Sequence, residues 1–352
     1  MTFNALFEAP LCPWMNGEGP EADIVLSSRV RLARNLDGYP FPNRADARTA
    51  AEVVGSIRHS LKSLSGSGQT YFFLELDKIL PLDRYVLVEK HITSPDHVRE
   101  PDNRALVVRD DTRVSIMVNE EDHLRIQGMT SGLSLAAAAA LANAADDRLE
   151  AENAFAFSEE TGYLTACPTN VGTGLRASVM IHLPALVMTR QMNRIVSAAT
   201  QLGLAVRGLY GEGTEAAGNI FQISNQQTLG LAEQEIIDNL TGIVKQIVDQ
   251  ERAARDALVR EHGDVLEDRV WRAYGILRHG RSISGQEALV MLSEVRLGID
   301  LGFITVAAPL VFNELLVSTR PNFLQRLAGE KELQPADRRR LRAKIIRDRL
   351  DN

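Results

Sequence analysis

Cysteine is scarce in this chain, which has only Cys12 and Cys167 among 352 residues. Two cysteines exclude a disulfide framework and a cysteine-based zinc site, and they favour a reducing compartment, so we expect a cytoplasmic protein. No window of about 18 uncharged apolar residues occurs, so no transmembrane helix and no membrane partner are expected. The first twenty residues place no basic residue ahead of an apolar core, so we expect no signal peptide.

Lysine is also scarce, because six of the 39 basic residues are lysine and arginine supplies the rest. Arginine binds phosphate with a planar fork, whereas lysine acts as a point charge, so phosphate binding is one interpretation. The base composition of a genome would produce the same bias. The net charge of −7 offers no general attraction to nucleic acid, and no DNA-reading motif occurs, so direct nucleic-acid binding is not expected.

The composition is otherwise that of a globular protein, with 45% hydrophobic and 24% charged residues. A chain of this length exceeds the size at which one hydrophobic core stops growing, so two domains are expected. Strand and helix patterns mix up to about residue 230, and only helix patterns follow. The predicted parts are an N-terminal segment (1–22), a mixed domain (23–240) and a helical C-terminal domain (241–352).

Hydrophobic periodicity and turn residues predict the elements of both domains. A capping box, Ser284 with Glu287, precedes one of the C-terminal helices, and the chain ends in a basic helix from Pro335. The predicted strands are 71–76, 105–108, 114–118, 154–157, 163–166 and 220–224, with an extended run at 24–35; the predicted helices are 46–66, 86–92, 134–150, 183–201 and 288–297.

One loop concentrates chemistry-bearing residues. Residues 167–180 contain Cys167, two glycines, several hydroxyl groups and Arg176, directly after a strand-like run. Glycines allow close backbone approach, and successive amides can form an anion-binding concavity that an arginine completes. The Gly-x4-Gly-Lys spacing of a P-loop is absent. The alternative is an ordinary turn with Arg176 on the surface.

Four other features could belong to the same site. Alternation places Arg29 and Arg31 on one side of an extended chain, either around an anion or on a solvated edge. Residues 119–126 place three adjacent acids before Arg125, which suits a solvated turn or a cleft with a base or metal ligand. His91 lies near the end of the predicted helix 86–92, as a surface or cap residue or as a ligand, and residues 205–215 form a glycine-rich surface turn or lid.

Together these segments resemble the ATP:guanido phosphotransferases, the family of arginine and creatine kinases. The blocks that carry the resemblance are Ser-Ser-Arg-Val-Arg at 27–31, Asn-Glu-Glu-Asp-His-Leu-Arg at 119–125, Cys-Pro-Thr-Asn-x-Gly-Thr-x-x-Arg-Ala-Ser at 167–178 and Arg-Gly-x-x-Gly-Glu-x-Thr-Glu at 207–215. Four blocks in the family's order over roughly two hundred residues make chance agreement improbable.

The resemblance implies an α+β fold with a glutamine-synthetase-like guanido kinase catalytic domain, an antiparallel sheet flanked by helices, and an all-α C-terminal domain. It implies ATP and Mg²⁺ as cofactors, with the metal held mainly by ATP and no dedicated metal site. An arginine cage would hold the phosphates, and it consists of Arg29, Arg31, Arg125, Arg176 and Arg207. The full set of implied nucleotide-binding residues is Ser27, Ser28, Arg29, Val30, Arg31, His91, Arg125, Arg176, Ala177, Ser178, Val179, Met180, Arg207, Gly208, Leu209, Tyr210, Gly211 and Glu212.

The resemblance also implies which residues handle the substrate. A guanidinium with a pKa above about 12 is a poor nucleophile until a proton leaves, and two carboxylates can bind it and accept that proton. Glu121 is the implied base, Glu212 the second clamp, and Glu120 supports local geometry or metal hydration. Cys167 would lie near the guanidinium in a tuning role, with simple packing as the alternative.

Within the family the chain is most similar to bacterial protein-arginine kinases of the McsB type. Metabolite kinases carry a helical domain before the first block, where this chain has 26 residues, and this chain has a helical domain after the last block instead. The similarity implies arginine phosphorylation on proteins with exposed arginines, which marks them for Clp-type proteolysis in stress response. Implied partners are a second copy through the helical domain, a zinc-finger activator protein and a Clp ATPase or protease.

Two departures from the family pattern stand out. Tyr210 occupies a position where metabolite kinases commonly have arginine. The Arg-Asp-x-x-Arg-Ala motif of a phosphoarginine pocket is matched by residues 338–343, with Arg339 in place of the aspartate. Arg338 and Arg342 are the implied ligands of such an allosteric pocket, and a basic solvated helix is the alternative. A kinase for free arginine or another guanidino metabolite, and an inactive client-binding adaptor, are the alternative functions.

Overall fold

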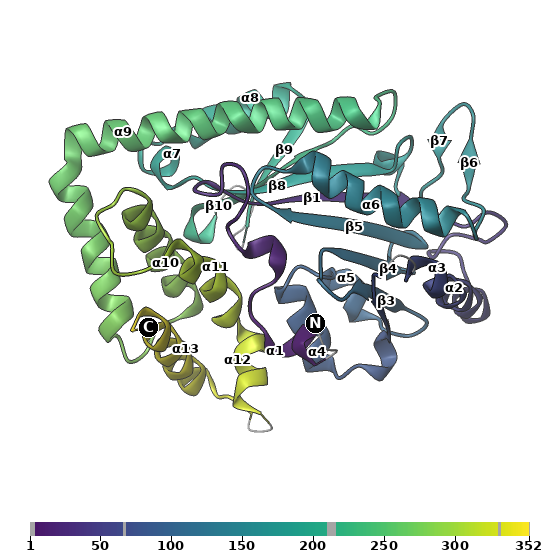
Figure 1. Ribbon diagram of the computed structural model, residues 1–352, viewed down its shortest axis with the longest axis horizontal. Helices are drawn as coiled ribbons and strands as arrows, with labels where there is room; N and C mark the ends of the chain where they lie inside the picture. The colour runs from purple at the N-terminus through teal and green to yellow at the C-terminus, as the bar shows by residue number, and fades with distance from the viewer. Residues whose placement is uncertain (1–3, 66–67, 210–215, 330–331, 352) are drawn as a thin grey trace.

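The computed structural model describes residues 4–65, 68–209, 216–329 and 332–351. Within these residues the largest sheet has eight antiparallel strands in the order β2-β3-β4-β5-β1-β8-β10-β9 (Figure 1). A two-stranded ribbon, β6 (Phe157–Ser158) with β7 (Gly162–Tyr163), projects beside it. The strands of the sheet are β1 (Val25–Arg34), β2 (Tyr71–Glu75), β3 (Ala105–Arg109), β4 (Val114–Val118), β5 (Leu124–Ser131), β8 (Leu175–His182), β9 (Leu204–Gly208) and β10 (Ile220–Asn225).

One face of this sheet forms the larger hydrophobic core. Val30, Ile126, Val179 and Ile223 of the central strands point into it, and helix side chains such as Ala142 fill it from above. Strand residues alternate between faces, so every second residue of β1, β5, β8 and β10 contributes here. The helices on this side include α6 (Leu135–Glu150), α7 (Pro184–Met188), α8 (Met192–Gln201) and the first part of α9 (Glu233–His279), as Figure 1 shows.

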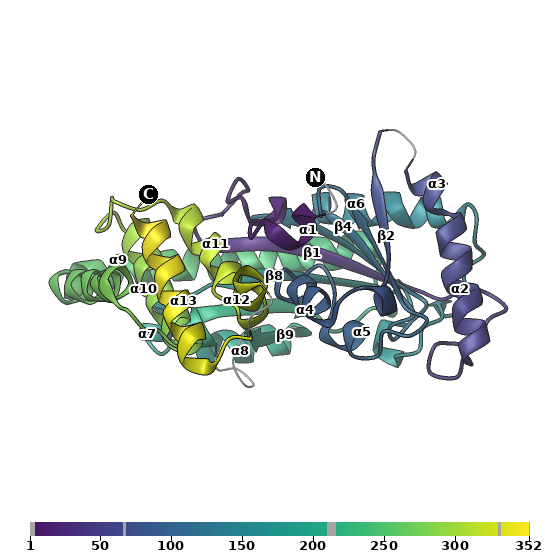
Figure 2. The same ribbon diagram turned by 90° about the horizontal axis from the view of Figure 1, so that it is seen from below.

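The second core lies on the other face and extends into the C-terminal helices. It joins Trp14 of the N-terminal segment, Leu106 of β3 and Leu87 of α4 (Pro81–Glu89) to Leu292 and Phe323 of the C-terminal region. The C-terminal helices gather at one end of the molecule, and α2 lies at the other (Figure 2). The remaining helices are α1 (Ala5–Glu8), α2 (Ala47–His59), α3 (Leu61–Leu64), α5 (Pro95–Arg99), α10 (Gly285–Asp300), α11 (Pro309–Ser318), α12 (Pro321–Ala328) and α13 (Pro335–Leu350).

Helix α9 connects the two cores. Its first part, from Ile236 to Ala254, packs in the larger core, and its second part, from Leu266 to Leu277, packs in the other. The change of direction occurs at His262, whose φ of −142° and ψ of 30° are not helical. The predicted domain boundary at 240 falls inside this helix and stays a prediction.

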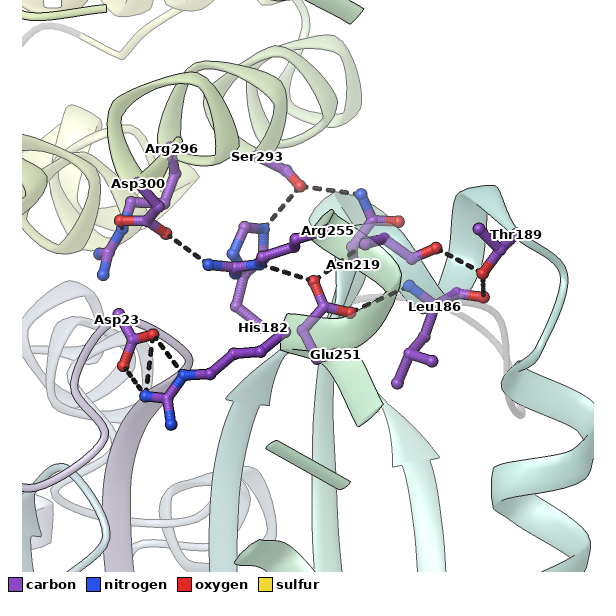
Figure 3. A network of polar contacts seen from close by, with 12 residues as sticks. Asp23, His182, Leu186, Thr189, Asn219, Glu251, Arg255, Ser293, Arg296 and Asp300 are labelled. Atoms are coloured by element: carbon purple, nitrogen blue, oxygen red, sulfur yellow. Dashed lines mark hydrogen bonds and ion pairs between the residues drawn. The ribbon is translucent and has the colours of Figure 1, made fainter. Parts of the chain in front are cut away.

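A buried polar network fastens the C-terminal helices to the end of the sheet (Figure 3). Glu251 of α9 is fully buried and accepts the backbone N–H groups of Ala185 and Leu186 at the start of α7, at 3.0 and 2.9 Å. The same carboxylate accepts Arg255 Nε at 2.9 Å, and Arg255 reaches Asp300 of α10. The two parts of the chain are therefore joined by charges that water does not screen.

Most predicted elements are confirmed, including the 105–118 hairpin and the capping box of α10. The single helix predicted over 183–201 is wrong, because two helices, α7 and α8, occupy that range. Arg190 between them has a φ of 58°, a left-handed conformation that no α-helix continues through. The strands predicted at 154–157 and 163–166 are wrong over most of their length, because β6 and β7 share only Phe157 and Tyr163 with them. The described residues include no helix that is both long and apolar enough to cross a bilayer.

Candidate active site

Four members of the arginine cage lie on three neighbouring strands of the sheet. Arg29 and Arg31 are on β1, Arg125 is on β5 and Arg176 is on β8, directly opposite Arg31 in the register. Val30, between the two β1 arginines, is fully buried in the larger core, so Arg29 and Arg31 share the opposite face. The predicted alternation of this strand is confirmed.

The surroundings of these arginines suit an anion. Burial, and then the charges of Arg125 and Arg176, lowers the pKa of Arg29 to about 10. Burial and the charges of its three neighbours also lower the pKa of Arg31. The buried Nε atoms of Arg31 and Arg176 have no hydrogen-bond partner within the described parts of the chain. Like charges directly opposite one another are unfavourable, so an anion placed between them would reduce the repulsion among these arginines.

Neighbouring strands hold Arg29 in place. Its Nη2 donates to Gln222 Oε1 of β10 at 2.7 Å, and its Nε donates to Ser178 Oγ of β8 at 3.2 Å. Gln222 is opposite Arg207 of β9, the fifth member of the cage, which is exposed. Burial, and then the charge of Arg207, lowers the pKa of Arg176, so Arg207 lies within electrostatic reach of Arg176.

The arginines open onto a cavity of about 360 Å³, called here the arginine-lined cavity. Its wall includes Arg29, Arg31, Arg125, His91 and Arg320. Burial, and then the charges of Arg29 and Arg320, lowers the pKa of His91 to about 3, so the imidazole is neutral at neutral pH. The structure therefore places His91 in the wall of the cavity that the predicted cage surrounds.

The two adjacent glutamates after β4 differ in their partners. Arg125 Nη1 donates to both carboxylate oxygens of Glu120 at 2.5 Å, and Ser94 Oγ donates to Oε1. Burial alone would raise the pKa of Glu120, but the charge of Arg125 and the hydrogen bond from Ser94 outweigh it, so its pKa is lowered. Glu120 is thus committed to orienting Arg125. Glu121 is exposed, and its carboxylate has no hydrogen bond or ion pair with another side chain of the described residues.

Glu121 lies where cavities meet. Together with Arg31, Arg125, Cys167 and Arg176 it lines a cavity of about 150 Å³, called here the thiol cavity. Glu121 also lines a second cavity, of about 750 Å³. This acidic cavity has four further carboxylates in its wall and one arginine: Asp46, Glu100, Asp102, Glu120 and Arg104.

A buried aspartate fixes the loop of Cys167 against the loop of Glu121. Asp122 Oδ1 accepts the N–H of Ala166 at 2.6 Å and Asn35 Nδ2 at 2.7 Å. The predicted reading of the three acids as one solvated turn is therefore wrong for Asp122, which is 3% exposed. Cys167 is half-buried, and its Sγ lies 3.0 Å from Thr169 Oγ1.

The loop needs a glycine where it joins β8. Gly174 has a φ of 65°, and a Cβ there would lie 2.6 Å from the carbonyl oxygen of Ala33 and 2.7 Å from Arg34 Nη1. A side chain would separate the loop from β1, so Gly174 allows the close approach that brings Cys167 and Arg176 beside Arg31.

Some predicted nucleotide-binding residues point away from the cavity. Val30, Ala177 and Val179 are fully buried in the larger core, so only their backbones could contribute. Ser28 is buried, donating to the carbonyl of Gly132 at 2.8 Å. Of the others, Ser27 is buried while Met180, Gly208 and Leu209 are half-buried. Tyr210, Gly211 and Glu212 lie outside the described residues.

The predicted phosphoarginine ligands lie on α13. Arg342 is buried and donates to the carbonyls of Thr319 at 2.9 Å and Ile283 at 3.0 Å. Burial, and then the charges of Arg338, Arg320 and Arg339, lowers the pKa of Arg342 to about 10. A fully solvated helix is therefore excluded for the face of α13 that carries Arg342. The phosphoarginine role stays a prediction.

Four residues that contribute to the site were missed from sequence. Gln222 orients Arg29, and the alternation of β10 beside β8 was the only available signal. Glu100 and Asp102 line the acidic cavity but belong to no motif. Arg320 comes from a helix far along the chain, and no local pattern places it here.

The comparisons with known proteins agree with this geometry. Residues 52–254 match the family described as ATP:guanido phosphotransferase, C-terminal catalytic domain. A relative in Desulforamulus reducens named protein-arginine kinase is 50% identical over 354 residues, covering 100% of this chain and 99% of the relative. The chain belongs to the ATP:guanido phosphotransferase family. Residues 263–352 match the family described as Protein-arginine kinase McsB C-terminal domain.

Other relatives of this ATP:guanido phosphotransferase extend the comparison. A protein-arginine kinase of Moorella thermoacetica is 53% identical over 340 residues, covering 96% of this chain and 97% of the relative. The taurocyamine kinase of Schistosoma mansoni with transition state analog components has a TM-score of 0.60 at 29% identity, covering 72% of this chain and 36% of that one. Lombricine kinase has a TM-score of 0.58 at 27% identity, and the match covers 72% of this chain and 76% of that one. The predicted guanido kinase fold is confirmed.

The residues present fit the ATP that this family implies. The unpartnered Nε atoms of Arg31 and Arg176 can donate to phosphate oxygens, and the clustered guanidinium groups need a polyanion between them. No cluster of three or more His, Cys, Asp or Glu side chains arranged for a metal ion occurs among the residues with described positions.

Proposed function

We propose that this protein is a protein-arginine kinase, which transfers the γ-phosphoryl group of MgATP to the guanidinium of arginine side chains in proteins. The observation that carries the proposal is the arrangement of cavities around Arg125 and Glu121, with arginines on one side and carboxylates on the other. The arginine-lined cavity suits ATP, the anionic phosphoryl donor, and the acidic cavity suits a cationic arginine side chain as the phosphoryl acceptor. The names of the relatives that align along the whole chain support the same activity.

In this mechanism the arginine cage neutralises and aligns the phosphates. Arg29 is held by Ser178 and Gln222, and Arg125 by Glu120, so both guanidinium groups are oriented before the substrate arrives. Phosphoryl transfer asks mainly for positioning and charge stabilisation from the protein. Bound Mg²⁺ would add neutralisation of the phosphate oxygens. Guanidinium groups that are already oriented cost no reorganisation during the reaction.

Glu121 is the general base in the proposed chemistry. Its exposed carboxylate can bind the planar guanidinium of the substrate, orient one nitrogen and accept the proton that the nitrogen loses. The N–P bond forms as the bond between the γ-phosphorus and the oxygen of ADP breaks. Cys167 lines the thiol cavity beside Glu121 and would tune the position of the guanidinium. Glu212, the expected second clamp, lies outside the described residues.

The acidic cavity supports a protein rather than a free amino acid as acceptor. Its volume of about 750 Å³ extends from Glu121 past Asp46, Glu100 and Asp102, all of which are exposed. The backbone and neighbours of an arginine inside a polypeptide would need such space, and the carboxylates favour a cationic segment. The catalytically inactive adaptor is not favoured, since such a protein has no use for oriented arginines beside an available glutamate.

The proposed setting follows from the family. We propose a cytoplasmic enzyme of the stress response that acts on proteins with exposed arginines and marks them for a Clp ATPase and protease. Dimerisation through the C-terminal helices and activation by a zinc-finger protein belong to the same proposal. Arg338 and Arg342 would bind phosphoarginine there as an allosteric ligand, with the arginine at position 339 altering the guanidinium side of the pocket.

A comparison of acceptors tests the proposal. The full chain is incubated with MgATP and either free L-arginine or an unfolded arginine-rich protein at the same arginine concentration, and ADP release is followed. We expect turnover with the protein that exceeds turnover with L-arginine by at least about tenfold. ADP release with L-arginine alone would overturn the protein substrate, and binding of the protein without ADP release would favour the adaptor.

A further inference from the structure

Helix α12 brings an arginine from the C-terminal region into the wall of the arginine-lined cavity. Arg320 is the N-cap residue of α12 and lines this cavity together with Arg29, Arg31, Arg125 and His91. The other four residues of this set come from the part of the chain that forms the sheet. Arg320 belongs to none of the four sequence blocks of the family and is separated from them by more than a hundred residues.

The start of α12 is fixed at the cavity by a glutamate of the catalytic domain. Glu89, the last residue of α4, also lines the cavity. Its Oε1 accepts the backbone N–H of Asn322 at 2.9 Å and Asn322 Nδ2 at 2.8 Å, and its Oε2 accepts the N–H of Phe323 at 2.8 Å. The first N–H groups of a helix lack partners within it and favour an anion, so Glu89 sets where α12 begins.

A second contact fixes the orientation of the same helix. Arg326 Nη1 lies 2.5 Å from Asp83 Oδ1 of α4, about two turns from the start of α12. Between the two contacts Phe323 and Leu324 are buried. The position of Arg320 is therefore determined by the packing of α12 on α4 at two points, and not by a surface loop alone.

The charge of Arg320 acts on the cavity. It is one of the charges that, after burial, lower the pKa of His91, and one of those that oppose the effect of burial on Glu89. Both carboxylate oxygens of Glu89 accept backbone N–H groups of α12. The cavity wall next to His91 therefore has the positive charge of Arg320 beside a carboxylate already engaged by a helix.

We propose that Arg320 is a further nucleotide-binding residue, through which the C-terminal domain donates a guanidinium to a phosphate of ATP in the arginine-lined cavity. The inference rests on the proposed function in so far as ATP occupies that cavity. It makes nucleotide affinity a property of both domains, since α12 has to be packed on α4 for the contact to exist.

The test uses the full chain and two arginine-to-glutamine substitutions in its C-terminal part. R320Q removes the charge at the cavity, and R272Q, the control, removes an arginine of α9 whose side chain is 77% exposed and that does not line the arginine-lined cavity. Dissociation constants for ADP and ATP are measured by calorimetry, together with KM for ATP, kcat and the thermal midpoint. R320K serves as a second variant, which keeps the positive charge but loses the planar guanidinium that can donate two parallel hydrogen bonds to a phosphate.

We expect R320Q to weaken ADP and ATP binding by about tenfold or more and to raise KM for ATP with kcat nearly unchanged. R320K should lose less, and R272Q should stay within about twofold of the unsubstituted chain. Equal losses in R320Q and R272Q would overturn the direct contact, as would unchanged binding in R320Q. If the unsubstituted chain bound no ADP, the proposed function itself would fail, so the two failures are distinguishable.

Discussion

Glu120 and Glu121 are adjacent in the sequence but have different roles at the scale of single residues. Glu120 is bound by Arg125 and Ser94, whereas Glu121 is exposed at the junction of the acidic and thiol cavities. Sequence identifies both as acids before a strand, but only their packing tells which one is already paired. The assignment of Glu121 as the base therefore leads to a direct test.

Glu121→Gln keeps the size of the side chain and removes the proton acceptor. We expect kcat for protein phosphorylation to fall by about 10²- to 10⁴-fold while ADP affinity stays within about twofold. The measurement is single-turnover phosphoryl transfer from ATP, with Glu267→Gln on the exposed side of α9 as the control. A Glu121→Gln enzyme with more than a tenth of the original rate would rule out this base.

Arg31→Met should separate stability from nucleotide binding. The guanidinium of Arg31 is surrounded by Arg29, Arg125 and Arg176, so its removal should raise the free energy of unfolding without ligand by up to about 1 kcal/mol. ATP should then stabilise the variant far less than the original chain. Urea unfolding with and without ATP measures both effects. A variant that loses stability without ligand and keeps its ATP response would contradict the account of the cage.

At the scale of elements, helix α6 packs unusually close to strand β5 through Gly128. A Cβ at this position would lie 2.2 Å from the carbonyl oxygen of Ala138, so the helix would have to move. Gly128→Ala should lower the free energy of unfolding by about 3 kcal/mol. The matched control is Gly55→Ala within α2, where nothing lies within 4 Å of the added carbon and a gain of about 0.5–1 kcal/mol is expected.

Chemical denaturation of the two glycine variants distinguishes packing from helix propensity. Opposite signs are the expected result, because only Gly128 contacts another element. An increased free energy of unfolding in both variants would contradict this, because it would mean that α6 and β5 move apart without loss of stability.

Most elements could be predicted from sequence because their signals are local. The alternation of Arg29, Val30 and Arg31 and the capping box at Ser284 each lie within a few residues. The break at Arg190 was missed because the apolar pattern continues on both sides of it. Gln222 and Arg320 were missed for another reason, since only the pairing of β10 and the packing of α12 on α4 bring them to the site.

At the scale of the whole molecule, the polar network of Figure 3 should make stability depend on pH. His182, at the end of β8, is buried with its Nε2 2.7 Å from Ser293 Oγ of α10. Burial, and then the charges of Arg255 and Arg296, lowers the pKa of His182 well below its ordinary value. The unfolded chain, with a histidine pKa of about 6.5, therefore binds a proton that the folded chain does not.

The difference in bound protons determines the direction of the stability change and the pH range in which it occurs. The stability that neutral His182 contributes is present above about pH 6.5 and is lost as the pH falls below it, by up to about 1.4 kcal/mol per pH unit. His182→Gln should flatten the decrease between pH 6.5 and 5, as measured by urea midpoints, with the exposed His59→Gln as the control for loss of an imidazole. Parallel curves for the original chain and His182→Gln would contradict the prediction.

The chemistry of the whole molecule is tested most directly by identifying the product. An unfolded arginine-rich protein is incubated with MgATP and the full chain, kept away from acid because the P–N bond is acid-labile, and analysed by mass spectrometry. The account predicts phosphorylated arginine side chains that are absent with Glu121→Gln. Phosphate found only on free arginine, or on serine, threonine or tyrosine, would contradict it.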